Sequence, residues 1–263
     1  MKIVLGIEYN GCNYYGWQRQ SISPTIQQTL ETALSTIANE SIRIHCAGRT
    51  DTGVHAIQQV IHFETSSIRD KHAWVRGTNS ILPKDISVVW ALESEDDFHA
   101  RFSAEQRTYQ YLILNRPARP AIFNGLASWE SRPIDFVKMK QASSYFIGQH
   151  DFTSYRAVAC QANSPIKTIY NFEVDKWQDW IVITLSANAF LHHMVRNIVG
   201  VLIAIGVGKK EVNWASEVLA AKDRTTGGVT ASPDGLYLVN IQYPKRFSIP
   251  KAKSVLDKFE IFR

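Results

Sequence analysis

An aspartate and an arginine stand two residues apart in a short segment bounded by glycines, Gly48-Arg49-Thr50-Asp51-Thr52-Gly53. The small neighbouring residues leave the oxygens of Asp51 open to a ligand, and the guanidinium of Arg49 favours the ionised carboxylate. An ionised, accessible carboxylate can act as a nucleophile or as a general base. The segment therefore predicts a catalytic carboxylate at Asp51.

A second charged residue, Arg196, interrupts an apolar segment that runs from residue 191 to residue 207. A guanidinium in apolar surroundings is unfavourable unless an anion and further hydrogen bonds receive it. One interpretation is a structural ion pair with an Asp or Glu elsewhere in the chain. The other is that Arg196 faces Asp51, which would then lie between two guanidinium groups and stay ionised at neutral pH.

Arginines also recur next to aromatic residues. Guanidinium groups contact phosphates and aromatic rings stack on unpaired bases, so this pairing suits single-stranded or loop RNA. The alternative is that the apolar stems of these arginines pack beside aromatic residues of the core. The formal net charge of +5 fits a polyanionic partner without requiring one. The segments are Trp17-Gln18-Arg19, Trp74-Val75-Arg76, Phe98-His99-Ala100-Arg101-Phe102, Arg107-Thr108-Tyr109 and Tyr155-Arg156.

Length and composition limit the class of protein. The chain has 263 residues and 45% hydrophobic residues, which is enough for one large domain or two modest ones. It contains no run of about 20 apolar residues that could span a bilayer, and its start leads into a strand pattern instead of a signal peptide. We expect a cytoplasmic globular protein. The three cysteines include no CxxC pair, which argues against a disulfide framework or a zinc–cysteine site.

Strands and helices alternate through the first part of the chain. Ser23 and Pro24 have the residue types of a helix N-cap and first helical position, and the helix after them carries an apolar stripe. The strand that ends at Cys46 leads directly into the Asp51 segment, so we expect Asp51 on a loop at a strand end. Strands are predicted over residues 3–9, 42–46, 60–64 and 86–91, and a second helix over 71–82.

The second part begins with a strand over residues 107–114, in which Tyr109, Tyr111 and Ile113 share one face by alternation. Residues 176–179 have the pattern of a hairpin turn between two apolar strands. Further helices are predicted over residues 136–146, over 191–207 and after Asn213, and further strands over 166–174, 181–187 and 236–241.

The acidic run over residues 93–97 marks the boundary between two domains. Residues 1–105 would carry the Asp51 loop, and residues 106–263 would carry Tyr109 and Arg196. The predicted class is α+β, with two linked sub-domains that each pack helices on a mixed, mostly antiparallel sheet.

Three segments together carry a resemblance to a known family. Residues 48–56, 107–111 and 190–200 resemble the signature segments of the tRNA pseudouridine synthase A family. The likeness continues through residues 16–20, 98–102 and 150–156, and it covers nearly the whole chain in the same order.

The resemblance implies the pseudouridine synthase fold, with an active-site cleft between the two sub-domains. It also implies isomerisation of uridines 38, 39 and 40 in the tRNA anticodon stem-loop, and a homodimer that binds tRNA. This reaction exchanges an N1 glycosidic bond for a C5 bond without redox chemistry, so no cofactor is needed, and the sequence contains no cofactor motif. No metal ligand is implied.

The resemblance also implies roles for individual residues. Asp51 would act at the ribose, either by attacking C1′ or by removing the C2′ proton. Tyr109 would stack on the uracil and assist proton movement at C5, and Arg196 would be the ion-pair partner of Asp51. Arg49 would fill the space left by the flipped nucleotide, and Leu236 would pack against the base from the other side.

The remaining expected RNA contacts are basic, aromatic or polar residues. Phosphate contacts carry no sequence information, so recognition would depend on the shape of the tRNA. The residues are Arg69, Arg76, Phe98, His99, Arg101, Phe102 and Gln161.

The sequence is also compatible with three alternatives, each of which its residues disfavour. Asp51-Thr52-Gly53 is also the aspartic-protease triplet, but that chemistry needs two carboxylates that share a proton, and the chain has one such triplet. A catalytically silent RNA-binding module or tRNA chaperone would use the same arginines and aromatics, but the presence of Asp51, Tyr109 and Arg196 together argues for catalysis. A metal site at His192-His193 is disfavoured because adjacent helix positions face different directions.

Overall fold

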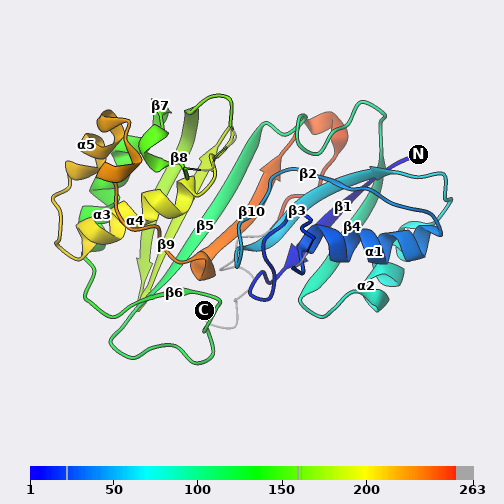
Figure 1. Cartoon of the computed structure of the whole chain (residues 1–263), viewed down its shortest axis with the longest axis horizontal. Coiled ribbons are helices and arrows are strands. Elements are labelled where there is room, and N and C mark those ends of the chain that lie inside the picture. The colour runs from blue at the N-terminus through cyan, green and yellow to red at the C-terminus, as the bar shows by residue number, and fades with distance from the viewer. Residues whose placement is uncertain (22, 159, 161, 253–263) are drawn as a thin grey trace. The chain divides into compact units, whose positions relative to one another are not determined.

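The computed structural model of the chain describes residues 1–21, 23–158, 160 and 162–252, and its described part forms two compact units. The first unit contains residues 1–107 together with the chain from Tyr237 onward, and the second contains residues 108–236. Both units combine helices with a sheet (Figure 1), so the predicted α+β class is confirmed. The sequence-based division assigned all of 106–263 to the second domain, whereas residues 237–252 group with the first unit.

The sheet of the first unit has a buried antiparallel centre. Its middle strand β1 (Lys2–Tyr9) pairs antiparallel with both β3 (His55–Glu64) and β4 (Ile86–Ser94). The short strand β2 (His45–Cys46) pairs antiparallel with β3. The late strand β10 (Leu236–Gln242) pairs in parallel with β3 through Tyr237 and Leu238, and this pairing is why the end of the described chain belongs to the first unit.

The helices of the first unit lie next to each other on one side of that sheet (Figure 1). Helix α1 (Ile26–Ala38) begins after Thr25, whose extended backbone and side-chain acceptor make it the N-cap. The prediction of Ser23 and Pro24 as cap and first helical residue was therefore wrong by two positions. The predicted apolar stripe is present, because Ile26, Leu30 and Leu34 are buried. The second predicted helix consists of a π-helical turn, η1 (Ala73–Gly77), and the short α2 (Thr78–Ile81).

The second unit also contains paired strands. The long strand β5 (Gln106–Asn115) pairs in parallel with β6 (Ser128–Glu130) on one side and neighbours β9 (Trp180–Ala187) on the other. Strands β8 (Ile166–Trp177) and β9 form the predicted antiparallel hairpin, with Trp177 opposite Trp180. The edge strand β7 (Gly148–Asp151) completes this sheet.

Three helices lie together on one side of these strands (Figure 1): α3 (Phe136–Ser143), α4 (Met194–Gly206) and α5 (Trp214–Ala221). At Gly206 an added Cβ would stand 2.8 Å from Ile134 and 2.9 Å from Met139, so glycine permits the close approach of α3 and α4. Among the described residues, no helix combines the length and apolarity needed to cross a membrane. Short 3₁₀ turns are η2 (Ser144–Phe146), η3 (Thr153–Tyr155), η4 (Arg224–Thr226), η5 (Pro233–Gly235) and η6 (Lys245–Phe247).

Candidate active site

The Asp51 segment is a hydrogen-bonded loop that connects β2 to β3, as the sequence predicts. The backbone N–H of Trp17 donates to the Thr50 carbonyl at 3.0 Å, and the N–H of Gly53 donates to the Tyr14 carbonyl at 3.3 Å. Asp51 itself is half-buried. Bonds on both sides of Asp51 therefore hold its backbone against residues 14–17, which restricts the positions that its carboxylate can reach.

The core beneath this loop explains its position. Trp17 is 1% exposed and packs against Tyr9 with ring centroids 6.1 Å apart. The Tyr9 hydroxyl lies 2.7 Å from Thr50 Oγ1, which connects the loop to the central strand β1. A catalytic group held on a rigid element keeps the geometry that its reaction requires. The loop thus has the preorganisation expected of a catalytic carboxylate.

The thiol that precedes the loop is not a competing nucleophile. Burial raises the pKa of the Cys46 thiol to about 12, although part of the residue reaches solvent and the positive charge of Arg49 opposes the shift. A thiol is nucleophilic as the thiolate, which this pKa makes negligible at neutral pH. Arg49 itself is exposed, so its guanidinium is accessible to a ligand.

Tyr109 lies in the second unit on β5. It is 7% exposed, and its ring packs edge-to-face against Phe190, with centroids 5.0 Å apart and an interplanar angle of 82°. Phe190 comes from the segment that precedes α4. An edge-to-face contact fixes the plane of a tyrosine ring without covering both of its faces.

Arg196 is anchored in the same unit by a backbone carbonyl. Its Nε donates to the Ala231 carbonyl at 2.8 Å, and the N–H of Ala231 donates to the Arg196 carbonyl at 3.1 Å. The neighbouring carbonyl, of Ser232, accepts from the Tyr111 hydroxyl at 2.7 Å. The structure therefore brings the side chains of Arg196 and Tyr111 to two consecutive carbonyls.

The place of Arg196 in its helix differs from the prediction. Helix α4 starts at Met194, so Arg196 is half-buried in the first helical turn instead of lying inside an apolar helix. A cation near a helix N-terminus adds to the positive end of the helix dipole. This position makes a local positive field that is suited to an anion. The partnership of Arg196 with Asp51 stays a prediction.

The histidines before α4 require a correction. The argument against a metal site placed His192 and His193 on a helix, but the helix begins after them and His193 has a positive φ of 62°. Their rings lie 4.1 Å apart, so they do not face different directions as helical neighbours would. The helical argument against a metal site at these two histidines therefore does not hold.

The predicted RNA contacts divide into surface and core residues. Arg69, Arg76, Arg101 and Phe102 are exposed, and His99 is half-buried. Phe98 is completely buried, with its ring 5.2 Å from that of Tyr243 and 5.0 Å from that of Phe247. Phe98 is thus a core residue with no ring face open to RNA. Leu236 is 5% exposed, and Gln161 lies outside the described residues.

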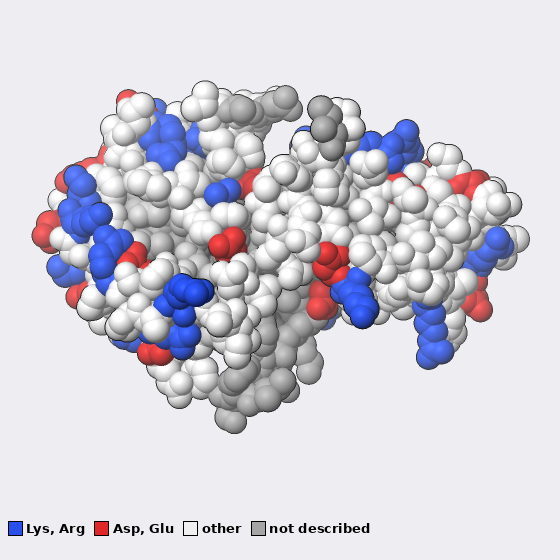
Figure 2. Space-filling model, turned by 60° about the horizontal axis from the view of Figure 1, so that its bottom comes forward, with Lys and Arg blue, Asp and Glu red and all other residues white. Residues whose placement is uncertain are grey.

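Basic side chains are not gathered into one band on the face shown in Figure 2. Lys and Arg form several separate groups there, and Asp and Glu side chains lie beside some of them.

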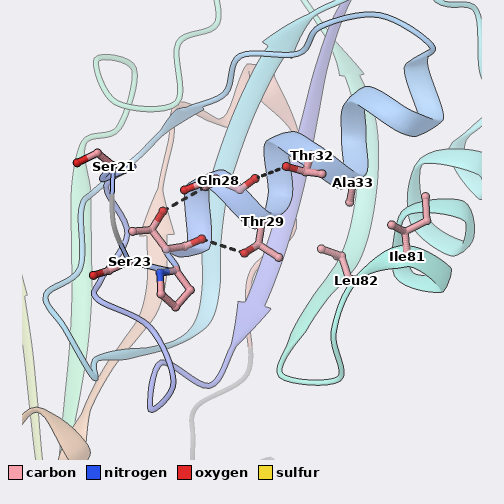
Figure 3. A pocket seen from close by; sticks show the side chains of 10 residues that line it. Ser21, Ser23, Gln28, Thr29, Thr32, Ala33, Ile81 and Leu82 are labelled. Atoms are coloured by element: carbon pink, nitrogen blue, oxygen red, sulfur yellow. Dashed lines mark hydrogen bonds between the residues drawn. The ribbon is translucent and has the colours of Figure 1, made fainter.

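A shallow hollow of about 470 Å³ lies beside α1 and α2 but contains none of the predicted site residues (Figure 3). Its polar lining is engaged with its own helix, because the Thr29 and Thr32 hydroxyls donate to the carbonyls of Thr25 and Gln28. The side chains drawn in Figure 3 do not converge on a common point, so we assign no chemistry to this hollow.

The segment that supports Arg196, residues 224–231, was given no role from the sequence. Arg224 donates from one guanidinium nitrogen to Asn197 Oδ1 at 3.1 Å, to the Gly228 carbonyl at 3.0 Å and to Thr230 Oγ1 at 3.1 Å. At Gly200 an added Cβ would stand 1.9 Å from the Val229 carbonyl oxygen. These contacts hold residues 228–231 against α4. The sequence signal for them was a polar segment, Arg224-Thr225-Thr226-Gly227-Gly228, that follows an apolar helix.

Comparison with known proteins finds relatives over almost the whole chain. A family model described as tRNA pseudouridine synthase matches residues 6–103 and 142–244. A protein named tRNA pseudouridine synthase A from Nitrosococcus oceani is 54% identical over 251 residues, 95% of this chain and 97% of that protein. One of the same name from Coxiella burnetii is 50% identical over 250 residues, 95% of this chain and 96% of that protein. A solved structure of a Cbf5–Nop10–Gar1 complex shares 10% identity at a TM-score of 0.41, over 90% of this chain and 48% of that one.

Proposed function

The chain belongs to the tRNA pseudouridine synthase family, and from this premise we propose that it isomerises uridine to pseudouridine at positions 38, 39 and 40 of the tRNA anticodon stem-loop. The observation that carries the proposal is the family match, which includes Asp51 in residues 6–103 and Arg196 in residues 142–244. The relatives named above share about half of their residues with this chain over nearly its full length.

The proposed reaction needs one carboxylate at the ribose. The bond between C1′ and N1 of the uracil breaks, a bond between C1′ and C5 forms, the C5 hydrogen leaves as a proton, and N1 gains a proton. Asp51 would either attack C1′ or remove the C2′ proton, and both routes stay open. The hydrogen bonds that hold residues 50–53 against residues 14–17 support this role, because they preorganise the carboxylate.

Further residues would act on the base and on the charge of Asp51. Tyr109, with its ring plane fixed by Phe190, would stack on the uracil and assist at C5. Arg196 would be the ion-pair partner of Asp51, and its bond to the Ala231 carbonyl would orient it. Arg49 would occupy the space of the flipped nucleotide, at the cost of unstacking that base. Leu236 would pack against the base.

The proposed partners are tRNA and a second copy of the chain. Exposed Arg69, Arg76 and Arg101 are suited to phosphate contacts, which would make tRNA binding weaken as salt rises. Sedimentation velocity tests the homodimer: a species at the single-chain mass of 29.8 kDa across the accessible concentration range would contradict it.

Release of tritium from tRNA labelled at uracil C5 tests the activity. We expect the wild type to release label and Asp51→Asn to release none while still binding tRNA. Asp175→Asn, which removes an exposed carboxylate from β8, is the matched control and should behave as the wild type. A transcript with cytidine at position 38, 39 or 40 should release less tritium, because one of the three proposed uridines is then missing.

The same experiment addresses the alternative of a silent RNA-binding module or tRNA chaperone. Binding of tRNA by the wild type without any release of tritium would favour that module and contradict the enzymatic proposal. Retained turnover in Asp51→Asn would remove Asp51 from its assigned role.

A further inference from the structure

The turn over residues 98–104 of the first unit is held by many hydrogen bonds to its backbone. The N–H of His99 donates to Ser103 Oγ at 3.0 Å, and the N–H of Ser103 donates to the His99 carbonyl at 2.9 Å. These two bonds close the turn at both ends. The residues between them, Ala100, Arg101 and Phe102, are therefore held in one loop conformation.

Two imidazoles receive the N–H groups inside the turn. The N–H of Ala100 donates to His62 Nδ1 at 3.1 Å. The N–H groups of Arg101 and Phe102 donate to His99 Nδ1 at 3.1 and 3.3 Å. Each Nδ1 can accept only when it carries no proton. Burial and neighbouring positive charge lower the pKa of both histidines, which keeps these nitrogens available as acceptors.

Three further side chains, Lys2, Arg107 and Tyr243, donate to carbonyl oxygens of the turn. Lysine and arginine donors make charge-assisted bonds, which are stronger than neutral ones. Side chains from three strands, β1, β3 and β5, and from the residue that follows β10 therefore bind the backbone of the turn on both sides of Arg101. The bonds run from Lys2 Nζ to Phe98, from Tyr243 Oη to Ala100, and from Arg107 to Arg101 and Ala104, at 2.9, 2.6, 2.7 and 2.9 Å.

The rigid backbone presents one aromatic ring and one cation to solvent. Phe98 anchors the turn in the core, whereas Phe102 is 75% exposed. The Arg101 guanidinium lies 5.5 Å from the Phe102 ring centroid, and the His99 ring centroid lies 4.3 Å from it. A single exposed phenylalanine is common on protein surfaces. Here, however, a hydrogen-bonded turn holds the backbone that carries the ring, and a binding group that is ordered in advance loses less entropy when it binds.

We propose that His62 and His99 are positioning residues that fasten an RNA-contact turn, in which Phe102 stacks on an unpaired nucleotide of the tRNA and Arg101 contacts a phosphate beside it. This inference rests on the proposed function. Within residues 98–102 it assigns Phe98 and His99 to holding the turn, and Arg101 and Phe102 to contacting RNA. Stacking of a base on an aromatic side chain contributes binding energy with little dependence on base identity. That property suits a surface that meets uridines in several sequence contexts.

Two substitutions at His99 separate its acceptor nitrogen from its ring. His99→Asn keeps a side-chain oxygen that can accept from the N–H two residues later, as in an Asx-turn, and His99→Phe keeps a ring without the acceptor. We expect His99→Phe to raise KM for tRNA by about tenfold more than His99→Asn, with kcat at saturating tRNA changing much less in both. A larger KM effect in His99→Asn would overturn the positioning role, because the ring itself would then be the contact.

Substitutions of the exposed pair test the contact directly. Phe102→Ala should raise KM without changing the dependence of tRNA affinity on salt, whereas Arg101→Ala should reduce the slope of log K against log salt by roughly one. If the turn had only a structural role, Arg101→Ala and Phe102→Ala would both keep the wild-type slope of log K against log salt. Tyr170→Ala, which removes an exposed aromatic ring from β8, is the matched control. Thermal melting of each variant shows whether it is folded.

The outcomes distinguish this inference from the proposed function. If the wild type releases tritium but Phe102→Ala and Arg101→Ala keep its KM and salt slope, the RNA-contact turn is overturned and the enzyme remains. If the wild type binds tRNA without releasing tritium, the proposed function fails, and the same variants measured by tRNA affinity still decide for or against the turn.

Discussion

Gly16 lies against Thr50 so closely that a Cβ at Gly16 would stand 2.8 Å from the Thr50 carbonyl oxygen and 3.1 Å from the carbonyl carbon of Asp51. Gly16 also has a positive φ of 84°, a conformation that glycine adopts without strain. The position of the proposed catalytic carboxylate therefore depends on a residue with no side chain in a segment distant in sequence.

Gly16→Ala should destabilise the protein and lower kcat, because the new methyl group would displace residues 50–51. Gly208→Ala is the matched control, since Gly208 has a φ of 74° but no atom within 4 Å of an added Cβ. We expect Gly208→Ala to cost about 1 kcal/mol from backbone strain alone, and Gly16→Ala to cost more. Chemical denaturation and tritium release measure the two effects. Equal losses of stability, with kcat unchanged in both variants, would contradict the expectation.

Stability should fall as pH falls, in a range set by His62. Burial, followed by the charges of His99, His45 and Lys2, lowers the pKa of His62 from 6.5 to about 3. Below pH 6.5 the unfolded chain binds a proton at this position that the folded chain excludes, so the free energy of unfolding decreases as pH is lowered from 6.5 toward 3. Denaturation by urea between pH 7 and pH 4.5 should show this decline.

The contribution of His62 to that decline can be isolated with His62→Gln. The glutamine oxygen can accept from the N–H of Ala100 but does not titrate, so we expect a flatter dependence of stability on pH in this variant. The exposed His72 is the matched control, and His72→Gln should keep the slope of the wild type. Identical slopes for His62→Gln and the wild type would show that other groups cause the decline.

Arg196→Lys should lower kcat although it keeps the positive charge. Lysine has no Nε–H donor in the arginine geometry, so the bond to the Ala231 carbonyl would be lost. We expect a loss of roughly 1 kcal/mol in stability from that bond, and a larger effect on tritium release if Arg196 orients Asp51. Arg119→Lys, at an exposed arginine, should change little in either measurement. A kcat equal to that of the wild type in Arg196→Lys would remove the orienting role.

Tyr111→Phe tests the hydrogen bond to the Ser232 carbonyl, which follows the Ala231 carbonyl that Arg196 binds. This change deletes the hydroxyl that donates to the half-buried Ser232 carbonyl, at a cost of roughly 1 kcal/mol. Tyr145→Phe on the exposed side of η2 provides the comparison. A melting temperature of Tyr111→Phe equal to that of Tyr145→Phe would show that the Ser232 carbonyl finds another donor.

Local patterns in the sequence predicted the features that depend on neighbouring residues. The hairpin of β8 and β9, the buried stripe of Ile26, Leu30 and Leu34, and the loop position of Asp51 all follow from alternation, helical spacing and turn residues. These features depend on residues that are close together in the sequence, so the sequence pattern is enough to predict them.

Features that depend on distant contacts were missed. The parallel pairing of Tyr237 with His55 and the complete burial of Phe98 arise from segments that are far apart in sequence. The late start of α4 arises instead from the positive φ of His193, a backbone conformation that a non-glycine residue rarely adopts and that composition does not reveal. Thr25 and not Ser23 caps α1 because only Thr25 has a side-chain acceptor at the first turn.

The parallel pairing of β10 with β3 has a consequence for synthesis of the protein on the ribosome. The strand that follows the Asp51 loop emerges early, but its neighbour on this side, residues 237 and 238, is translated only after the whole second unit. An N-terminal fragment would leave the edge of β3 at residues 55 and 56 without this partner, and unpaired edges promote aggregation. Nascent chains should therefore complete the strand pairing of the first unit only after most of the polypeptide has been synthesised.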